Sequence, residues 1–384
     1  MKIAIFETTH FEVAYTLIIL FDTPENELTI FIHDEAHQQL LFLLGSKANR
    51  YKWVVKKPMQ PNRKFIKTIF HYTKRHTFDL LYFNTIANNF ILYAYYLKRL
   101  QHIPSVLTLH DVNSHFQYKA SLSLKSHVRF IGKKLLIRKF QNFNVLADTM
   151  IPYLREKLPP QKKIFNIPGG CFQPGNEKFI QFKLGTRIKI VIPGSIDERR
   201  RDYSIVGELL DNAKRENIDI EISLLGAFNP PHCERIYEYC KNYLAHNSNL
   251  KIFEGKIVNQ QEYDQTIQDS HFVLMPIRTK VSIHDGIVEE YGKTICTGNI
   301  GDVIRHAKPF FVPAEIPLEA DLLNIALAYK GITDILEILN HLSPIGYEKM
   351  QERSLKASLY YTRENIIRRS PELFNPSNLI LTPG

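Results

Sequence analysis

The 384-residue sequence predicts an α/β protein made of two Rossmann-like, doubly wound domains that face each other across a cleft. The chain is too long for one ordinary hydrophobic core. Apolar strand-like runs alternate with helical stretches, and the alternation starts again after a loop-rich segment at 166–175. Parallel strands joined by helices form sheets covered on both faces, and ligands bind beyond the carboxyl ends of such strands.

The first domain is expected to span residues 1–175 and the second residues 185–345. Strands of the first domain are predicted from β-branched and aromatic runs at 2–8, 28–33, 52–55, 80–84, 105–109 and 144–147, with helices such as 65–74 and 89–101 between them. Strands of the second domain are predicted at 188–192, 221–225, 251–253, 272–275 and 310–312, with helices such as 203–215 and 234–244. Residues 346–384 are expected to form a charged tail that is helical as far as Pro371.

The charge of the chain is unevenly distributed. Hydrophobic residues make up 44% and charged residues 23%, which is typical of a globular protein. The formal net charge is +10, yet residues 1–170 hold 24 Lys and Arg against 11 Asp and Glu, a net +13, which leaves −3 for the remainder. This asymmetry predicts an anionic partner for the first half, such as membrane lipid, a phosphorylated acceptor or nucleic acid.

The cysteines and the N-terminus indicate a reducing compartment. Cys171, Cys233, Cys240 and Cys296 form no C-x-x-C pair and no zinc-ligand spacing, which favours reduced, buried thiols over a metal site. The chain opens on a strand-like run without the basic and apolar regions of a secretory signal. A cytoplasmic location is therefore expected.

Residues 112–146 contain no acidic residue but seven Lys and Arg, interleaved with apolar residues. This pattern predicts a basic amphipathic helix, which suits an anionic membrane surface. An ordinary packed helix with a solvated basic face is the alternative. The residues expected to face the membrane are Lys125, Arg129, Lys133, Lys134 and Arg138.

The segment 273–313 contains a strand, a polar loop, Glu289-Glu290-Tyr291-Gly292, a predicted helix and a Lys-Pro before the next strand. It resembles the sugar-nucleotide site of glycosyltransferase family 4, whose E-x-F-G motif Glu289, Tyr291 and Gly292 match with one conservative change. The resemblance implies that Glu289 or Glu290 holds sugar or ribose hydroxyls and that Gly292 lets backbone amides approach a diphosphate. The alternative is that the two glutamates cap a solvated helix.

The family has a second Glu seven residues after the first, and this chain departs from that pattern. Thr297 occupies the position in a gapless count, whereas alignment backward from the Lys-Pro places Asp302 there. Gly298 lies at a predicted helix start, which offers a second place for phosphate. The resemblance therefore implies donor contacts from Thr297, Gly298 and Asp302.

A second resemblance lies at the start of the second domain, where the family has a strand, a glycine and then basic residues. Counting from Gly194 places Arg200 at the family's Lys. The family's Arg directly after that glycine is absent here, so Arg199 or Arg201 would replace it. Guanidinium groups bind phosphate bidentately and stabilise a departing diphosphate. Gly226, after the next strand, is a weaker match, and an exposed charge run is the alternative for the arginines.

In the first domain, a strand ends in His110-Asp111, at the edge of the sheet where a base or a sugar-hydroxyl contact is expected. Family 4 enzymes have a similar strand on the acceptor side. We therefore take His110, Asp111 and Glu289 as the candidate catalytic residues. A buried histidine and a capping aspartate are the alternative for the first pair.

Together these resemblances imply a GT-B glycosyltransferase, in which the final helices, here 346–384, cross back onto the first domain. Its expected reaction is metal-independent transfer, with retention, of a sugar from a nucleotide diphosphate to a glycan or lipid-linked acceptor in cell-surface polysaccharide synthesis. No cofactor is expected. The protein would be cytoplasmic or peripheral on the inner face of the plasma membrane. Two alternatives remain: a basic nucleic-acid-binding protein, which explains only the charge, and a GT-B protein that binds nucleotide without turnover.

Overall fold

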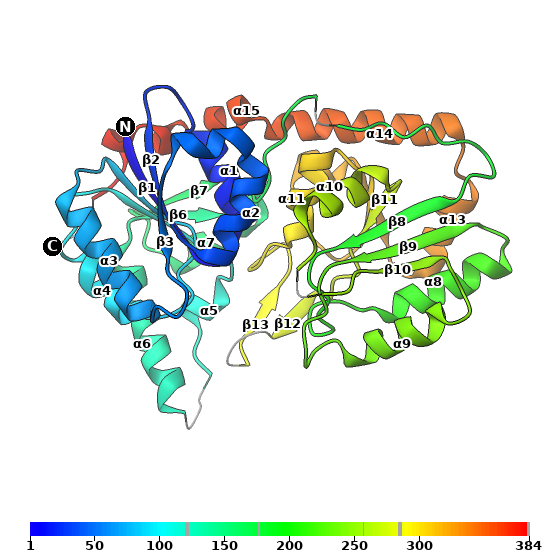
Figure 1. Ribbon diagram of the computed structural model, residues 1–384, viewed down its shortest axis with the longest axis horizontal. Helices are drawn as coiled ribbons and strands as arrows, with labels where there is room; N and C mark the ends of the chain where they lie inside the picture. The colour runs from blue at the N-terminus through cyan, green and yellow to red at the C-terminus, as the bar shows by residue number, and fades with distance from the viewer. Residues whose placement is uncertain (120–122, 176, 256, 283–285, 382–384) are drawn as a thin grey trace.

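The structure is a computed structural model that describes residues 1–119, 123–175, 177–255, 257–282 and 286–381. It contains two α/β units, each with a parallel sheet between layers of helices (Figure 1). The strands of the first unit are β1 (Lys2–Glu7), β2 (Glu27–His33), β3 (Lys52–Lys56), β4 (Leu80–Phe83), β5 (Ser105–Thr108), β6 (Asn142–Val145) and β7 (Lys163–Asn166). Its helices are α1 (Phe11–Phe21), α2 (Asp34–Leu44), α3 (Asn62–Arg75), α4 (Phe90–Leu97), α5 (Asn113–Phe116), α6 (Leu124–Lys139) and α7 (Ile151–Lys157).

The strands of the second unit are β8 (Ile188–Pro193), β9 (Ile220–Leu225), β10 (Leu250–Ile252), β11 (Phe272–Leu274), β14 (Phe310–Pro313) and β15 (Ala326–Tyr329). Its helices are α8 (Ser204–Arg215), α9 (Glu234–Leu244), α10 (Gln260–Asp269), α11 (Gly298–His306), α12 (Ala320–Leu323) and α13 (Ile332–Asn340). An antiparallel hairpin, β12 (Lys280–Ser282) and β13 (Val288–Glu290), leaves the sheet between β11 and α11. Two further helices, α14 (Pro344–Ser358) and α15 (Arg363–Arg369), end the chain.

The two sheets have the same kind of topology. The first has strand order β3-β2-β1-β4-β5-β6-β7 and the second β10-β9-β8-β11-β14-β15, with every neighbouring pair parallel. The order therefore reverses between β1 and β4 in one sheet and between β8 and β11 in the other. Such switch points open a crevice at the carboxyl ends of the strands.

Side chains alternate across the first sheet, as the period of two in a strand requires. Ile3 and Ile5 of β1 belong to the core under α1 and α2, whereas Ala4 and Phe6 belong to the core under α3 and α4. The ring of Phe6 stacks on that of Phe83, with centroids 4.1 Å apart. Because both faces are buried, the central strands β1 and β4 consist mostly of apolar residues.

The predicted doubly wound α/β architecture is confirmed, with three local differences. Strands β7 and β15 were not expected, because each has four residues that are partly exposed at the edge of a sheet. Strand β6 begins two residues before the predicted 144. The helix expected directly after Glu289–Gly292 begins only at Gly298, and Glu289 itself lies in β13. That expectation was wrong because Glu289 and Glu290 belong to a hairpin strand that pairs with β12. The helix can begin only after this hairpin.

The final helices connect the two units. Figure 1 shows α14 running along the second unit and α15 lying on the first. The guanidinium of Arg363 donates hydrogen bonds to the carbonyl oxygens of Ile19 (3.0 Å) and Leu20 (3.1 Å) at the end of α1. Within the described ranges, no helix is both long and apolar enough to cross a membrane. Residues 382–384 of the expected tail lie outside the described part.

Candidate active site

The loops after β8 and β9 pack backbone against backbone at the carboxyl edge of the second sheet. Gly194 has φ +90°, a conformation that favours glycine. A Cβ added to Gly226 would lie 2.1 Å from the carbonyl oxygen of Gly194. Glycine is therefore required at 226 for the two loops to meet, which is a packing role and does not depend on a ligand.

The three adjacent arginines have different surroundings. Arg199 donates from Nε (3.0 Å) and Nη2 (2.6 Å) to the carboxylate of Asp197. Although burial alone would raise the pKa of Asp197, its hydrogen bonds to Arg199 lower it below its ordinary value. Arg201 is buried and donates to the carbonyl oxygen of Gly194 (3.3 Å) and to Oδ1 of Asn299 (3.1 Å). Arg199 and Arg201 are thus engaged within the protein.

Arg200 is the arginine of this set that remains open to the cleft. Its Nε lies 3.7 Å from Oδ2 of Asp197, and this buried nitrogen has no hydrogen-bond partner among the described residues. The positive charge of Arg200 also acts on the first unit, because it contributes to lowering the pKa of His10. Arg200 can therefore receive an anionic group placed between the two units.

Helix α11 begins beside these arginines. Oγ1 of Thr297, at the N-cap, accepts a hydrogen bond from the amide of Asn299 (3.4 Å), whose side chain donates to the carbonyl oxygen of Pro193 (2.8 Å). A Cβ added to Gly298 would have no atom within 4 Å, so there is open space at the first turn. The positive end of the helix dipole and its amide groups favour a phosphate there.

Asp302, the candidate for the second acidic position, is buried within α11. Its carboxylate pairs with Arg305 (2.6 Å) and accepts a hydrogen bond from the hydroxyl of Tyr263 (2.9 Å). Burial of the ion pair explains why the charge is tolerated inside the protein. The structure therefore places Asp302 in an ion pair beneath the helix, on the side of α10.

The remaining motif residues lie around the hairpin. Glu290 is partly exposed and pairs with Lys280 and Lys293, each at 3.5 Å. Tyr291 is buried, and burial raises its pKa although the nearby Arg200 opposes this shift. Gly292 has φ +77°, and a Cβ there would lie 2.4 Å from the carbonyl oxygen of Pro317. Gly292 thus allows two chain segments to pack closely.

Glu289 reaches across to the first unit. Its Oε1 accepts a hydrogen bond from the amide of Ser114 (2.7 Å) and its Oε2 one from the amide of Asn113 (3.1 Å), at the start of α5. The amide of Val112 donates to the carbonyl oxygen of Thr294 (2.8 Å) beside this contact. Burial raises the pKa of Glu289 to about 7. Both oxygens of this candidate catalytic carboxylate are therefore used to hold the two units together.

Glu7 organises the facing side of the cleft, and it was not among the candidate residues selected from the sequence. Its Oε1 accepts hydrogen bonds of 2.5–2.7 Å from the amides of residues 8–10, and its Oε2 accepts from the side chains of Asn84 and Thr85. This buried carboxylate fixes the loop after β1. As a result His10, which the sequence analysis did not select, is placed beside His110. The sequence indicated only that the loop carrying His10 follows a strand and so lies at the cleft.

The predicted pair His110 and Asp111 lies at the end of β5, as expected. Nε2 of His110 is 2.8 Å from the carbonyl oxygen of Asn84. Although burial alone would raise the pKa of Asp111, His115 and the ammonium of Lys133 lower it below its ordinary value. Asp111 is therefore ionised at neutral pH and can accept a hydrogen bond from a ligand hydroxyl.

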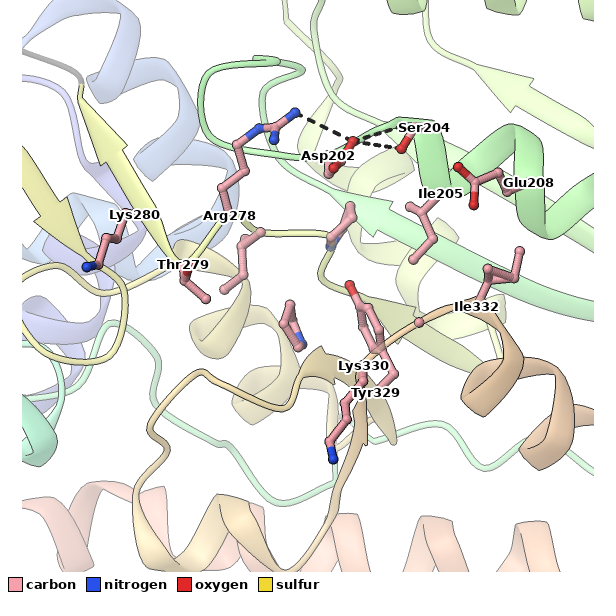
Figure 2. A pocket seen from close by; sticks show the side chains of 14 residues that line it. Asp202, Ser204, Ile205, Glu208, Arg278, Thr279, Lys280, Tyr329, Lys330 and Ile332 are labelled. Atoms are coloured by element: carbon pink, nitrogen blue, oxygen red, sulfur yellow. Dashed lines mark hydrogen bonds and ion pairs between the residues drawn. The ribbon is translucent and has the colours of Figure 1, made fainter.

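A cavity of about 500 Å³ lies next to this cluster, at the carboxyl ends of β11, β14 and β15 (Figure 2). Figure 2 shows Arg278 reaching toward Asp202, and their side chains are 3.5 Å apart. The cavity shares no lining residue with the cluster of Arg200, Thr297 and His110. Tyr329 and the first turns of α8 and α13 line its other side. The amide of Arg278, which lines the cavity, donates to the carbonyl oxygen of Arg200 (2.9 Å), so the cavity adjoins the arginine loop.

The basic helix α6 is present, but one of its predicted outward residues is not at the surface. Lys125, Lys134 and Arg138 are exposed and Arg129 is half-buried. Lys133 is buried, and its ammonium donates to the carbonyl oxygen and the Oγ of Ser114, each at 3.0 Å. The expectation that Lys133 faces outward was wrong, because this lysine lies on the side of α6 that packs against α4 and α5.

Neither thiol chemistry nor a metal cluster is evident in the described ranges. The four cysteines are free; Cys296 is half-buried and the other three are buried. Residues 1–119, 123–175, 177–255, 257–282 and 286–381 include no group of three or more His, Cys, Asp or Glu side chains placed to hold a metal ion.

Solved structures with the same arrangement identify the architecture. Anabaena HepE, determined with UDP and glucose, superposes with a TM-score of 0.66 over 97% of this chain and 99% of its own, at 11% sequence identity. The chain therefore has the GT-B fold. Sucrose-phosphate synthase from Thermosynechococcus elongatus matches this GT-B chain with a TM-score of 0.63 at 12% identity, over 97% and 98% of the two chains.

The GT-B fold by itself does not fix the reaction. A Listeria monocytogenes protein assigned as a UDP-N-acetylglucosamine 2-epimerase also matches, with a TM-score of 0.58 at 12% identity over 98% and 96% of the two chains. No family model matches the sequence, and no curated protein sequence matches it. The activity must therefore be argued from the site.

Proposed function

We propose that the protein is a glycosyltransferase that moves a sugar from a nucleoside diphosphate to a hydroxyl of a glycan or lipid-linked acceptor. The proposal extends to cell-surface polysaccharide synthesis on the cytoplasmic side of the membrane, with retention of the anomeric configuration and without a metal ion. The GT-B fold supports this reaction class. The arrangement of Arg200, α11 and the histidine pair in the cleft supports the assignment of the site.

The donor diphosphate is assigned to the space between Arg200 and the first turn of α11. The Nε of the guanidinium has no hydrogen-bond partner among the described residues, and the open space at Gly298 leaves room for oxygens beside the helix N-terminus. Both supply positive charge where negative charge develops on the departing diphosphate. Fixed positive charges of the protein therefore stabilise the diphosphate, as a metal ion does in other transferases. The nucleoside is assigned to the cavity that Arg278 and Tyr329 line.

The first unit supplies the acceptor side. His110 and the ionised Asp111 lie at the end of β5, across from Arg200, and can hold hydroxyl groups of the sugar or the acceptor. Thr8 Oγ1 and Asn84 Oδ1 are further buried polar atoms at this strand edge without a hydrogen-bond partner among the described residues. Buried polar atoms of this kind are ordinarily satisfied, so they point to a polar ligand.

In the proposed reaction, the bond between the anomeric carbon and the diphosphate oxygen breaks while a bond from the acceptor oxygen to that carbon forms. Retention requires both events on the same face of the sugar. The acceptor hydroxyl then lies beside the departing diphosphate, which keeps the electron pair of the broken bond and takes up the hydroxyl proton. Arg200 and α11 stabilise the diphosphate as its charge grows.

The observation that carries the proposal is Arg200, whose buried Nε has no hydrogen-bond partner among the described residues and whose charge acts on His10 of the first unit. The test is calorimetric titration with UDP, GDP, dTDP, ADP and CMP in the absence of metal. We expect one nucleoside diphosphate to bind and Arg200→Ala to weaken it about ten- to a hundred-fold, since a hydrogen bond to a charged group contributes about 1.5–3 kcal/mol. Arg235→Ala is the matched control, because Arg235 is an exposed arginine paired with Glu198.

Binding of none of these nucleotides would contradict the donor site. A nucleotide that binds without any sugar release from its sugar conjugates, whichever acceptor is offered, would indicate a GT-B protein without turnover. Conversion of the sugar in the absence of acceptor would indicate an epimerase instead. Salt-sensitive RNA binding without nucleotide binding would favour the nucleic-acid alternative.

A further inference from the structure

Helix α6 carries an apolar face that no part of the described chain covers. Leu124, Val128, Ile131 and Leu135 are all exposed, and their spacing of four, three and four residues places them on one side of the helix. Leu124 is 78% exposed and Ile131 is 53% exposed. Figure 1 shows α6 projecting away from the body of the first unit. A soluble helix ordinarily buries such a stripe, so this one marks a contact surface.

The apolar surface continues onto α4. A Cβ added to Gly132 of α6 would lie 2.9 Å from Cβ of Phe90 and 3.1 Å from Ile91. Glycine at 132 thus allows the two helices to pack closely, and it brings Ile91 next to the stripe. Ile91 and Tyr95 of α4 are exposed as well. We define the α6 face by its six exposed apolar residues: Ile91, Tyr95, Leu124, Val128, Ile131 and Leu135.

Basic side chains border the α6 face. Lys125, Lys134 and Arg138 are exposed on α6, and the guanidinium of Arg99 lies 3.7 Å from the ring centroid of Tyr95. From residue 80 to residue 146 the only acidic residue is Asp111, which lies in the cleft and not on this face. The surface is therefore apolar at its centre and cationic at its border, and residues 80–146, which include α4 and α6, add no carboxylate to it.

We infer that the α6 face is a docking surface for an anionic lipid bilayer. Aliphatic side chains on one side of a helix enter the acyl boundary of a bilayer while lysine and arginine reach the anionic headgroups. Nucleic acid would neutralise the same charges but would leave Leu124 and Ile131 in water. The aliphatic stripe therefore favours lipid over RNA as the occupant.

Helix α6 also contacts the acceptor side of the cleft, through the side opposite the α6 face. Lys133 of α6 donates hydrogen bonds to Ser114 of α5, and α5 follows directly after Asp111. The helix that would lie on the bilayer is therefore the same helix that supports the segment after Asp111. If the protein has the proposed function, an acceptor carried by a lipid is the substrate class that fits this position. Only this inference about the acceptor rests on the proposed function. Lipid binding itself does not depend on the reaction.

The test is sedimentation of the full chain with vesicles of phosphatidylcholine alone or mixed with phosphatidylglycerol. We expect binding only to the anionic vesicles, and its loss at about 0.5 M salt, where the Debye length is about 4 Å. Lys125→Gln, Lys134→Gln and Arg138→Gln together should weaken partitioning by about five-fold per charge. The pair Leu124→Ser and Ile131→Ser should weaken it at least about ten-fold.

Matched controls are exposed residues of the second unit: Leu323→Ser with Ile345→Ser, and Lys214→Gln with Lys349→Gln. These should leave partitioning unchanged, and circular dichroism should show that all variants are folded. Absence of binding by the unaltered chain, or equal loss in the control variants, would overturn the inference. Binding of single-stranded RNA that needs the basic residues but not Leu124 and Ile131, without vesicle binding, would assign the surface to nucleic acid. Nucleotide calorimetry on the same variants tests the donor site separately.

Discussion

The imidazole of His10 stacks on that of His110, with ring centroids 4.3 Å apart and an interplanar angle of 19°. The two rings come from loops after β1 and β5, which are not adjacent in the sheet. The carboxylate of Glu7 accepts hydrogen bonds from the amides of the first loop, including that of His10. The stack therefore depends on a carboxylate three residues before His10. Although His10 is exposed, partial desolvation in the cleft and the neighbouring His110 lower its pKa below the ordinary value.

His10→Phe tests whether the nitrogen atoms of this ring take part in transfer. Phe keeps the stack but can neither accept nor donate a hydrogen bond, so we expect transfer to slow at least about ten-fold with nucleotide affinity unchanged. Because the pKa of His10 is lowered, its imidazole signals should titrate below pH 6.5 in NMR spectra. Titration near the ordinary value of 6.5 would contradict the described environment.

Gly226→Ala and Gly298→Ala should have opposite consequences. The added methyl group at 226 would meet the carbonyl oxygen of Gly194, so we expect a loss of about 1–3 kcal/mol in the free energy of unfolding. At 298 the methyl group meets no atom within 4 Å, so stability should be unchanged or about 0.5–1 kcal/mol higher, while nucleotide affinity falls. Urea unfolding and calorimetry separate the two effects. Unaltered affinity in Gly298→Ala would argue against phosphate at the start of α11.

Lys133→Met tests the buried lysine under α6. The substitution keeps most of the aliphatic stem but removes both hydrogen bonds to Ser114. We expect the free energy of unfolding to fall by about 1–3 kcal/mol. Lys134→Met, one residue further along and exposed, should change it by less than about 0.5 kcal/mol. Equal values in urea unfolding would mean that the two lysines have equivalent surroundings.

Glu289 should make the stability of the protein depend on pH. Burial raises its pKa from 4.5 to about 7, so the folded protein binds this proton more tightly than the unfolded chain does. The contribution to stability is therefore largest at low pH and is lost as the pH rises through about 7, by a total of order 1–3 kcal/mol. Glu289→Gln remains neutral and should remove this decline in urea unfolding measured at about pH 5 and pH 8.

The matched control for this measurement is Glu290→Gln. Glu290 is the next residue along the hairpin, but its carboxylate is partly exposed and pairs with two lysines. Exposed ion pairs contribute little to stability. The free energy of unfolding of Glu290→Gln should therefore differ from that of the unaltered protein by less than about 1 kcal/mol at both pH values. A pH dependence of the same size in both variants would show that Glu289 is not the responsible group.

The sequence predicted the architecture because buried parallel strands are nearly continuous apolar runs. Strands such as β1 and β14 have this character, and α9 was predicted to the residue. Edge strands β7 and β15 lack it, because only one side of each is paired and their residues are partly exposed. The hairpin was missed for a different reason: its two three-residue strands pair with each other, so no periodic pattern distinguishes them from a loop.

The sequence predicted which loops form the site but not which residues of those loops face the cleft. Strand ends located the arginine cluster and His110-Asp111, because ligand sites form at the carboxyl edge of a parallel sheet. The sequence could not separate Arg200 from Arg199 and Arg201, since their difference lies in contacts with Asp197 and Asn299. Neither could it separate Lys133 from Lys134, which differ by about 100° around one helix. His10 was missed because a single residue in a loop after a strand has no spacing to mark it.

The contact between Glu289 and α5 limits how this chain can be divided. Two amides at the start of that short helix are satisfied by a residue 175 positions further along the chain. A fragment ending before β8 would lose these acceptors, and it would also lose the Arg363 contacts that α15 makes with α1. The first unit is thus not a separable module. A chimaera that exchanges one half for that of another GT-B protein would have to transfer the hairpin and the C-terminal helices together with the first unit.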